Sequence, residues 1–403
     1  SPLGDPNADF DATDVAEAQR IAREIWGIDA GGISSDASNT VLEEYAVKID
    51  WNISDNHRAN FRYSNLDQSK VRPEGSSNST LALSSAWYVQ EKTVESYVGQ
   101  VFSDWTENFS TEFKVSFRDY SAIRVTPTTA PTIEIYFGGT EAAPGGDLIR
   151  LGTERSSQGN ALTTETWNYF GAGTWTLGDH DVKFGAEYSD NEIYNYFSQD
   201  SWGNYRRTRK ANGDMRAIFL NGVATQAQLL NTPLEWLDQL RADFGIYAQD
   251  SWTMKRLTVN YGGRWEYFAH GRPAETSPAG RYTAARSFDR LDMPTWKSFS
   301  PRGGAVFDVF GNQKTAVKLS VGKYMQAGST GFSESYNPLA LTTATVAWTD
   351  ANRDGVPQGD LGCVYQTAGC EINLAQLPNG FGVASLSNFD PEIKRMYNIE
   401  EAV

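Results

Sequence analysis

Histidine and cysteine, on which much enzyme and metal chemistry depends, are scarce in this chain of 403 residues. It contains three histidines, His57, His180 and His270, and two cysteines. The sequence has no serine motif with a nearby histidine, no histidine pair at metal-ligand spacing and no glycine-rich phosphate loop after an expected strand. We therefore predict that the protein is not an enzyme, and we assign no catalytic or cofactor-binding residue.

Long apolar runs are also missing. The chain has no stretch of about 18 consecutive apolar residues, which excludes transmembrane helices. Aromatic residues nevertheless make up 13% of the chain, while the mean hydropathy is −0.49. A membrane barrel needs an apolar residue only at every second position, so its sequence looks polar on average. The composition therefore still allows a membrane protein.

Positive charge is low relative to negative charge, and the net charge is −15. Nucleic-acid phosphates require many Lys and Arg side chains, so we expect no nucleic-acid partner. The one basic run, from Arg206 to Lys210, is flanked by loop-like residues. We predict that this run forms a solvated loop.

The two cysteines, Cys363 and Cys370, are separated by six residues. A disulfide between them suits an oxidising compartment such as the periplasm or the cell surface, and the alternative is two free or buried thiols. Neither a histidine nor a second cysteine pair accompanies them, so a zinc site is not expected.

What the sequence does contain is regular alternation of apolar and polar residues. In residues 43–53, Tyr45 and Trp51 belong to an apolar face, and Lys48 and Asp50 belong to a polar face. A short polar turn and a second alternating segment follow, as in a hairpin with one apolar face and one charged face. Such hairpins recur in residues 43–64, 93–118, 161–188, 242–267 and 298–322.

The connections alternate in length, as do those of an outer-membrane barrel with tight periplasmic turns and large extracellular loops. Those within hairpins have two to four residues, whereas those between hairpins are long. Trp51, Trp105, Trp175 and Trp252 lie beside the short turns, as the interfacial girdles of such barrels do. We predict an all-β fold, a transmembrane antiparallel up-and-down β-barrel. The alternative is a soluble β protein with these aromatic residues in its core.

Two helices are expected inside the long loops. Asp14 and Glu17 match a capping box, and an apolar stripe that ends at Gly27 follows them. We assign this helix to a helical extracellular segment over residues 1–40, and residues 41–403 to the barrel. A second helix is predicted from Thr232 and Pro233 onward, through Leu234, Leu237 and Leu240.

One loop has the first half of a calcium-binding pattern. Asp350, Asn352 and Asp354 alternate before Gly355, which would make the sharp turn of a calcium loop. The full pattern places a glutamate at the twelfth position, which is Leu361 here. Calcium binding and a plain polar β-turn are both compatible with this segment, and it is the one cofactor site that the sequence indicates.

Several segments resemble a known family. The stretches 244–252 and 257–267, FGIYAQDSW and LTVNYGGRWEY, look like a hairpin found across TonB-dependent receptor barrels. The stretches 299–308 and 310–324 are similar to the next hairpin of that family. The loop 350–358, DANRDGVPQ, resembles more narrowly the Oar-like branch.

The resemblance implies a 22-stranded barrel in the Gram-negative cell outer membrane, with an N-terminal plug domain and a TonB box. The alternating segments account for ten strands and an eleventh near 395–403, about half of such a barrel, and neither plug nor TonB box is visible. The start, Ser1 to Asp5, does not look like a signal peptide. We therefore expect a fragment or a truncated product, and an open sheet edge in lipid makes the half-barrel unstable alone.

For function, the resemblance implies ligand-gated, energy-coupled uptake across the outer membrane. The partners would be outer-membrane lipid, an extracellular ligand and the TonB complex, which acts through the plug region. Polar residues such as Arg62, Arg118, Arg264 and Glu266 would then face the plug. The first alternative is a surface binding or adhesion barrel without transport. The second is a lipase-like barrel, which needs a Ser–His pair that the scarcity of histidine disfavours.

Overall fold

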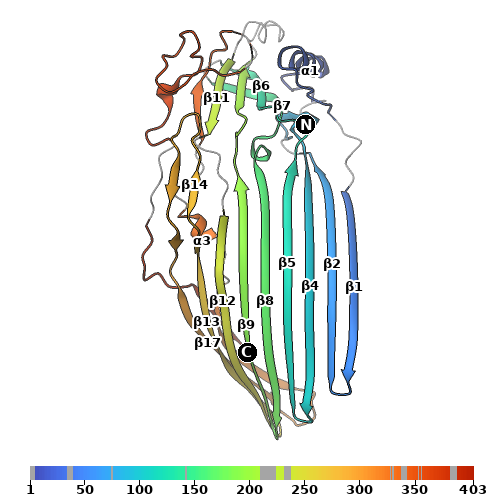
Figure 1. Cartoon of the computed structure of the whole chain (residues 1–403). Coiled ribbons are helices and arrows are strands. Elements are labelled where there is room, and N and C mark those ends of the chain that lie inside the picture. The colour runs from blue at the N-terminus through green and yellow to red at the C-terminus, as the bar shows by residue number, and fades with distance from the viewer. Residues whose placement is uncertain are drawn as a thin grey trace.

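The computed structural model of the chain describes residues 5–33, 40–73, 76–140, 143–208, 224–230, 237–326, 328, 331–336, 343–352, 354, 356–381 and 388–403. Two sheets dominate the described part. A tall sheet carries the short turns at one end, and a smaller sheet lies among the long connections at the other end (Figure 1).

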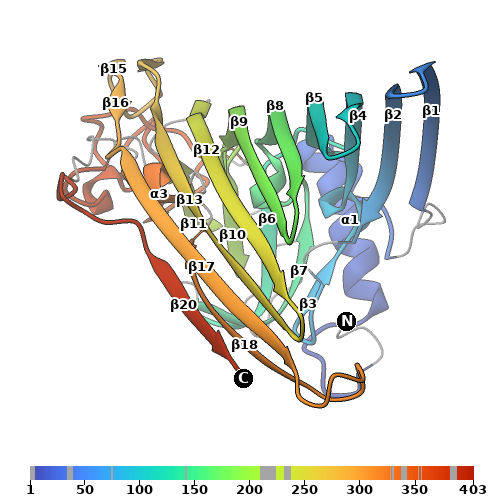
Figure 2. The ribbon, with the colours of Figure 1, turned by 90° about the horizontal axis from the view of Figure 1, so that it is seen from below.

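The large sheet confirms the predicted meander of antiparallel strands. Eleven strands pair in sequence order, each with its neighbour in the chain, and β16 pairs with β13 beside this path. Seen from below, the sheet bends into an open arc with β1 and β20 at its two edges (Figure 2). The strands are β1 (Thr40–Ser54), β2 (His57–Arg72), β4 (Tyr88–Thr106), β5 (Phe109–Val125), β8 (Asn160–Leu177), β9 (His180–Phe197), β12 (Leu237–Met254), β13 (Leu257–Arg272), β16 (Leu291–Asp292), β17 (Trp296–Asp308), β18 (Ala316–Met325) and β20 (Tyr397–Ala402).

The two faces of the large sheet differ as the alternation predicts. On the outer face large apolar side chains are exposed rather than packed, for example Trp51 at 62% and Phe113 at 56%. The inner face carries charged side chains at the intervening positions, such as Lys114. A soluble protein rarely exposes so large a continuous apolar surface. The alternative of aromatic residues in a soluble core is therefore wrong for this sheet.

Two rows of aromatic residues border the apolar part of the outer face. On β4, Tyr97 belongs to the upper row and Trp105 to the lower row, eight positions apart, and on β8 Trp167 and Trp175 have the same spacing. Eight residues of extended chain span about 26 Å, close to the apolar band of outer-membrane barrels. Between the rows, the outward positions of β4, β5, β8 and β9 carry no charged residue.

Just beyond the upper row, the outer face becomes acidic. Glu95, Asp119, Glu165 and Glu192 lie directly opposite one another across β4, β5, β8 and β9. The hydroxyl groups of Tyr63 and Tyr97 donate hydrogen bonds to Glu95 Oε1 over 3.1 and 2.7 Å. Carboxylates favour water over hydrocarbon, so this row marks the outer limit of the apolar band.

The long connections pair with one another into a second sheet of six strands, which we call the cap sheet. Its order is β19-β11-β10-β6-β7-β3, and the pairs β10–β6 and β3–β7 are parallel. Four of the five long connections contribute to it. The strands are β3 (Thr80–Ala82), β6 (Thr132–Gly139), β7 (Pro144–Leu151), β10 (Asn204–Thr208), β11 (Ala224–Leu230) and β19 (Thr343–Ala347).

Helix α1 (Ala12–Trp26) covers part of the cap sheet with its apolar stripe. The predicted helix and its end at Gly27 are confirmed, but the predicted capping box is wrong. Asp11 is the N-cap and exchanges hydrogen bonds with Asp14, because the helix begins one turn earlier than expected. Together, helix and sheet bury a core of Phe10, Val15, Ala18, Ile21, Ala22, Ala30, Leu81, Leu83, Ile133, Ile135, Ile149 and Leu151.

A second core lies at the other end of the cap sheet. Trp348, Val346, Ala227, Leu229, Tyr282 and Ile372 are buried there, and they come from three different connections. The remaining elements of the loops are short: η1 (Ser84–Ala86), η2 (Arg155–Ser157), β14 (Glu275–Ser277), β15 (Arg286–Phe288), α3 (Gly331–Glu334) and η3 (Leu374–Gln376). None of the described helices is long and apolar enough to span a bilayer.

The second predicted helix is wrong where the structure describes it. Leu237 and Leu240 belong to β12, which pairs with β9 on one side and β13 on the other. Pairing along both edges outweighs a local helical pattern of leucines. Residues 231–236, where that helix was expected to begin, lie outside the described residues.

Candidate functional site

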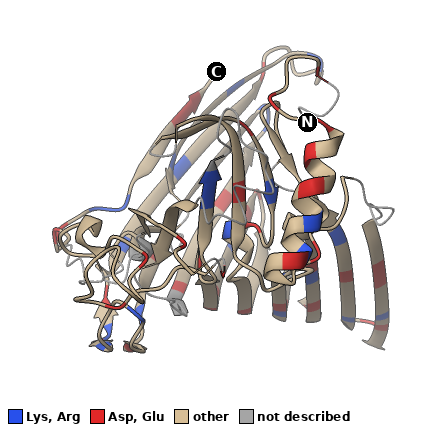
Figure 3. Cartoon of the chain, turned by 90° about the horizontal axis from the view of Figure 1, so that it is seen from above, with Lys and Arg blue, Asp and Glu red and all other residues tan. Residues whose placement is uncertain are grey.

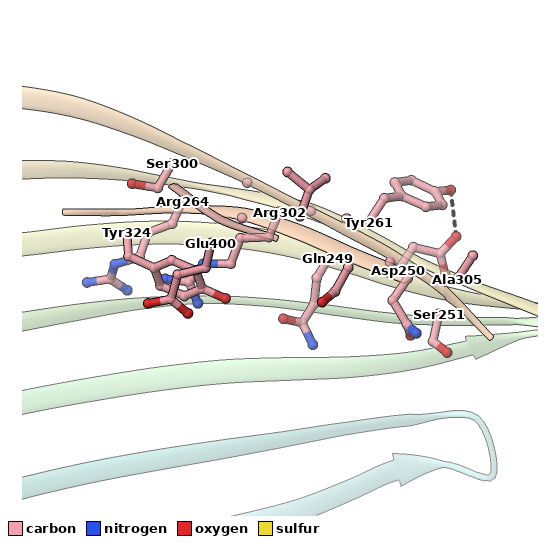
Figure 4. Close-up of a pocket in the computed structure, with 18 of the residues that line it drawn as sticks. Gln249, Asp250, Ser251, Tyr261, Arg264, Ser300, Arg302, Ala305, Tyr324 and Glu400 are labelled. Atoms are coloured by element: carbon pink, nitrogen blue, oxygen red, sulfur yellow. Dashed lines mark hydrogen bonds between the residues drawn. The ribbon is translucent and has the colours of Figure 1, made fainter. Parts of the chain in front are cut away.

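The inner face of the large sheet forms a trough of about 1450 Å³. Strands β9, β12, β13, β17, β18 and β20 provide its walls, and charged side chains of both signs line it. Figure 4 shows Gln249 on one side of the strands, and Tyr261 with Asp250 on the other side. The charged lining residues on the inner face are Lys183, Glu187, Arg264, Arg302, Lys318 and Glu400.

Ion pairs connect the strands at the loop end of the trough. Arg264 contacts both Glu187 of β9 and Glu266 of its own strand. Glu266 also lies 3.7 Å from Nη1 of Arg395, which comes from the connection after β18. Arg264 and Glu266 therefore occupy the inner face, as expected, and so do Arg62 and Arg118. Their polar groups can contact water, a solute or a protein segment in the lumen.

The outer face holds one polar cluster close to the lower aromatic row. Asp250 accepts a hydrogen bond from the Tyr261 hydroxyl over 2.7 Å, and Nδ1 of His180 lies 2.6 Å from the same carboxylate oxygen. The His180 ring stacks on Trp252 with centroids 5.1 Å apart. A carboxylate directed toward lipid is costly unless it is paired, and these contacts supply the pairing. His180 therefore acts as a structural partner at the membrane interface.

The predicted solvated basic loop is wrong for its first two residues. Arg207 lies in β10, is 1% exposed, and donates to Asp350 Oδ2 over 3.0 Å. Its guanidinium also lies over the rings of Trp348 and Trp26, at 4.6 and 5.1 Å. Burial lowers the pKa of Arg207, and the Asp350 carboxylate opposes that shift. The partners come from segments far away in the sequence, which a local reading of charge does not include.

Arg206 points to a second ionic cluster of the cap sheet. Its Nε lies 3.2 Å from Glu134 Oε2, and Arg150 donates to Glu134 Oε1 over 2.8 Å. The Tyr136 hydroxyl donates to the same carboxylate, and burial together with the nearby Glu134 raises the pKa of Tyr136 to about 12. Glu134 is 5% exposed and is thus compensated by two cations.

Part of the calcium-like pattern converges in space. Carboxylate oxygens of Asp350, Asp354 and Glu371 lie within 4.8 Å of one another. Glu371 Oε1 accepts hydrogen bonds from the backbone N–H groups of Ala351 and Asn352. The sequence pattern did not include Glu371, because this residue lies twenty-one positions after Asp350. The side chain of Leu361, at the predicted twelfth position, is 60% exposed. Three carboxylates beside Arg207 give this cluster a net negative charge.

Two other predicted site residues lie in the same loop. Asn352 Oδ1 accepts a hydrogen bond from the Asp354 backbone N–H over 3.0 Å, so it serves the turn itself. Cys363 and Cys370 form a disulfide in the structure. Along α1, which covers the other part of the cap, two acidic bands are followed by two basic bands and one further acidic band (Figure 3).

An antiparallel sheet with an apolar outer face between aromatic rows, a polar inner face and long loops at one end defines an outer-membrane β-barrel protein. In agreement, residues 28–400 match the family model described as an outer membrane beta barrel domain. The chain belongs to this family, and the outer membrane is its location. It matches none of the curated proteins with which it was compared.

Solved structures with a similar fold include three outer-membrane proteins. The outer membrane transporter YddB from Escherichia coli has a TM-score of 0.49 and 11% identity, and the match covers 77% of this chain and 38% of that chain. For the ferric-catecholate import receptor Fiu from Escherichia coli the TM-score is 0.46 and the identity 11%, with 79% of this chain and 50% of that chain covered. For the alcaligin outer membrane receptor FauA from Bordetella pertussis the TM-score is 0.43 and the identity 10%, with 76% of this chain and 40% of that chain covered. The chain thus spans half or less of the length of each of them.

Proposed function

We propose that the chain is the barrel part of a TonB-dependent receptor that takes up a ligand from outside the cell. The observation that carries this proposal is the combination of a folded cap at the loop end with a polar trough on the inner face. A cap built from several connections offers a surface for first contact with a solute. The polar residues below it, such as Arg264 and Arg302, suit a hydrated path or a plug domain.

Energy coupling would come from the plug region and the TonB complex, as the family resemblance implies. To test this, cells that carry the whole receptor are grown with and without a protonophore, and depletion of candidate solutes from the medium is measured. We expect depletion that requires both the receptor and the proton gradient. Equal depletion in the receptor deletion strain would contradict the proposal.

The alternative is a surface binding or adhesion barrel. The six-stranded cap favours this alternative because a folded surface suits binding of a partner protein. Attachment would not need the proton gradient, so the protonophore separates the two functions. We also infer a non-enzymatic role: His57 contacts Trp105, and His180 contacts Asp250 and Trp252, contacts that explain these two histidines structurally.

We further propose that calcium binds at Asp350, Asp354 and Glu371. Glu371 would supply the carboxylate that the sequence pattern lacks at position 361, and hard oxygen ligands suit this ion. Calcium added to the purified chain should protect the cap from protease, and Glu371→Gln should abolish that protection. A response to calcium that persists in Glu371→Gln would place the ion elsewhere.

A further inference from the structure

At its loop end, the inner face carries an aromatic cluster around a buried histidine. Phe268 and His270 of β13 and Trp296 of β17 have ring centroids 5.1 to 5.8 Å apart. His270 is 1% exposed, and among the residues that the structure describes neither its Nδ1 nor its Nε2 has a hydrogen-bond partner. These residues lie on the same side of their strands as Glu266 and Ser300, so the cluster continues the polar trough toward the cap.

The described surroundings of His270 provide no hydrogen-bond partner for its imidazole. A neutral imidazole has one donor and one acceptor nitrogen, and leaving both unpaired in a protein interior is unfavourable. The rings of Phe268, Trp296 and Phe332 lie around it, tilted by 39 to 46° relative to the imidazole plane. Unsatisfied buried groups of this kind are rare and require an explanation. A polar group brought by a ligand would supply one.

The ring of Phe332 in α3 packs against the cluster. Its centroid lies 5.5 Å from that of His270 and 5.6 Å from that of Trp296. Tyr336 and Phe389 extend the same aromatic contacts outward, each at 5.3 Å. A phenyl ring can stack there, but it has no atom that can hydrogen-bond to the imidazole. The loop therefore fills the place with an aromatic group that lacks the polar atom His270 needs.

Hydrogen bonds hold the base of the connection between β18 and β20. Arg395 Nε donates to Gln326 O over 2.8 Å, and its guanidinium lies 5.1 Å from the Phe268 ring centroid. Gln326 N donates in turn to Met396 O over 2.9 Å. By contrast, the hydrogen bonds of Ser335 return to Gly331 within the α3 segment. As far as the described residues show, displacing Phe332 breaks ring contacts and leaves the hydrogen-bonded base in place.

We propose that Phe268, His270 and Trp296 form a binding site for a planar aromatic ligand that carries a hydroxyl group, and that Phe332 occupies this site until the ligand displaces it. The aromatic rings stack on the ligand, and His270 forms a hydrogen bond with its hydroxyl. The site lies between the cap and the trough. The proposal deepens the proposed uptake function by naming a ligand class, but it concerns binding alone and can be tested without transport.

The test measures binding of two water-soluble probes, 6-hydroxynaphthalene-2-sulfonate and naphthalene-2-sulfonate, by calorimetry. The probes are added to lipid vesicles that hold the whole outer-membrane protein of which this chain is the barrel part. The probes differ by one hydroxyl, and the shared sulfonate keeps both out of the lipid. We expect the hydroxylated probe to bind about tenfold more tightly, the worth of one buried hydrogen bond. Phe332→Ala should tighten its binding by a further factor of about ten, because the competing ring is gone.

Variants of His270 distinguish the loss of the hydrogen bond to the ligand from a loss of folding. His270→Phe should bind both probes equally, whereas His270→Gln keeps a donor and an acceptor and should retain the preference for the hydroxyl. Phe310→Ala, which removes an exposed ring at a distant turn, should behave as the unchanged chain. Preference that survives in His270→Phe, or unchanged affinity in Phe332→Ala, would overturn the proposal. Transport that fails while these differences hold would contradict only the uptake function.

Discussion

The large sheet and the cap sheet place their apolar side chains in two different environments. In the large sheet each strand pairs with its chain neighbour, and the apolar residues are exposed on the outer face. In the cap sheet, strands from separate connections pair, and residues such as Ile149 and Val346 are almost fully buried. The first sheet needs lipid as its solvent, whereas the second has its own core.

This difference separates the interactions on which each part depends. The large sheet relies on neighbours close in sequence and on an apolar environment outside the protein. The cap relies on contacts between segments far apart in the sequence, such as Arg207 with Asp350, 143 residues apart. Substitutions that impair one part should therefore leave the other part measurable, and the following predictions use that independence.

The largest effect is expected when the buried ion pair of the cap loses its acid. Asp350→Asn leaves the Arg207 guanidinium buried without its carboxylate, at a cost of about 3–5 kcal/mol. The cap should become sensitive to protease, while the strands between the aromatic rows stay protected by lipid. Limited proteolysis with mass spectrometry measures both regions. Cleavage spread equally over both sheets would contradict the independence of the cap.

Removing buried volume from the cap core should have a similar or slightly smaller effect. Ile149→Ala creates a cavity at a position with no exposed surface, which costs about 2–5 kcal/mol. Hydrogen exchange should rise in β6, β7 and α1. Exchange in β4 and β5 should stay unchanged, and Val356→Ala, at a half-exposed loop position, serves as the matched control.

The large sheet should respond to charge on one face only. Phe113→Arg puts a cation on the outer face between the aromatic rows, which costs about 2–4 kcal/mol near the middle of a bilayer. Ser116→Arg, on the inner face of the same strand, should insert almost normally. Insertion into vesicles is followed by protection from protease. Equal losses in both variants would mean that the two faces have the same surroundings.

The smallest effect is expected for the disulfide. Cys363→Ser with Cys370→Ser opens a short loop in the second cap core, with a cost of about 2 kcal/mol. The change should be confined to the cap around Trp348 and Ile372, and local hydrogen exchange would detect it. A loss of membrane insertion in this variant would show that the two sheets are coupled after all.

The sequence allowed the large sheet to be predicted because the relevant information is local. Alternation at period two, polar turns and tryptophan beside those turns define each hairpin and its lipid face, and the strand pairs follow chain order. The cap could not be predicted in the same way. Arg207 pairs with Asp350 and Arg206 with Glu134 across different connections, while Glu371 joins Asp350 and Asp354 from a distant part of its own connection. No periodic pattern indicates which of these segments will meet.

Individual errors have the same origin. The basic run at Arg206 and Arg207 looked solvated because its acidic and aromatic partners are far away in the sequence. Leu237 and Leu240 matched a helix, but pairing with β9 and β13 decided their conformation. The occurrence of Asp350, Asn352 and Asp354 at every second position was informative, yet Glu371 joins Asp350 and Asp354 while Asn352 serves the turn.

The most direct test of the central claim measures which side chains of β5 face lipid. Nitroxide labels are placed singly from Ser110 to Val125 in the whole outer-membrane protein that contains this chain, in vesicles, after Cys363 and Cys370 are replaced by serine. Their accessibility to oxygen and to a water-soluble nickel complex is compared. We expect accessibility to oxygen to peak at the odd positions from Thr111 to Phe117. At the odd positions from Asp119 onward, accessibility to the nickel complex should rise. Equal accessibility of odd and even positions to both reagents would contradict the account.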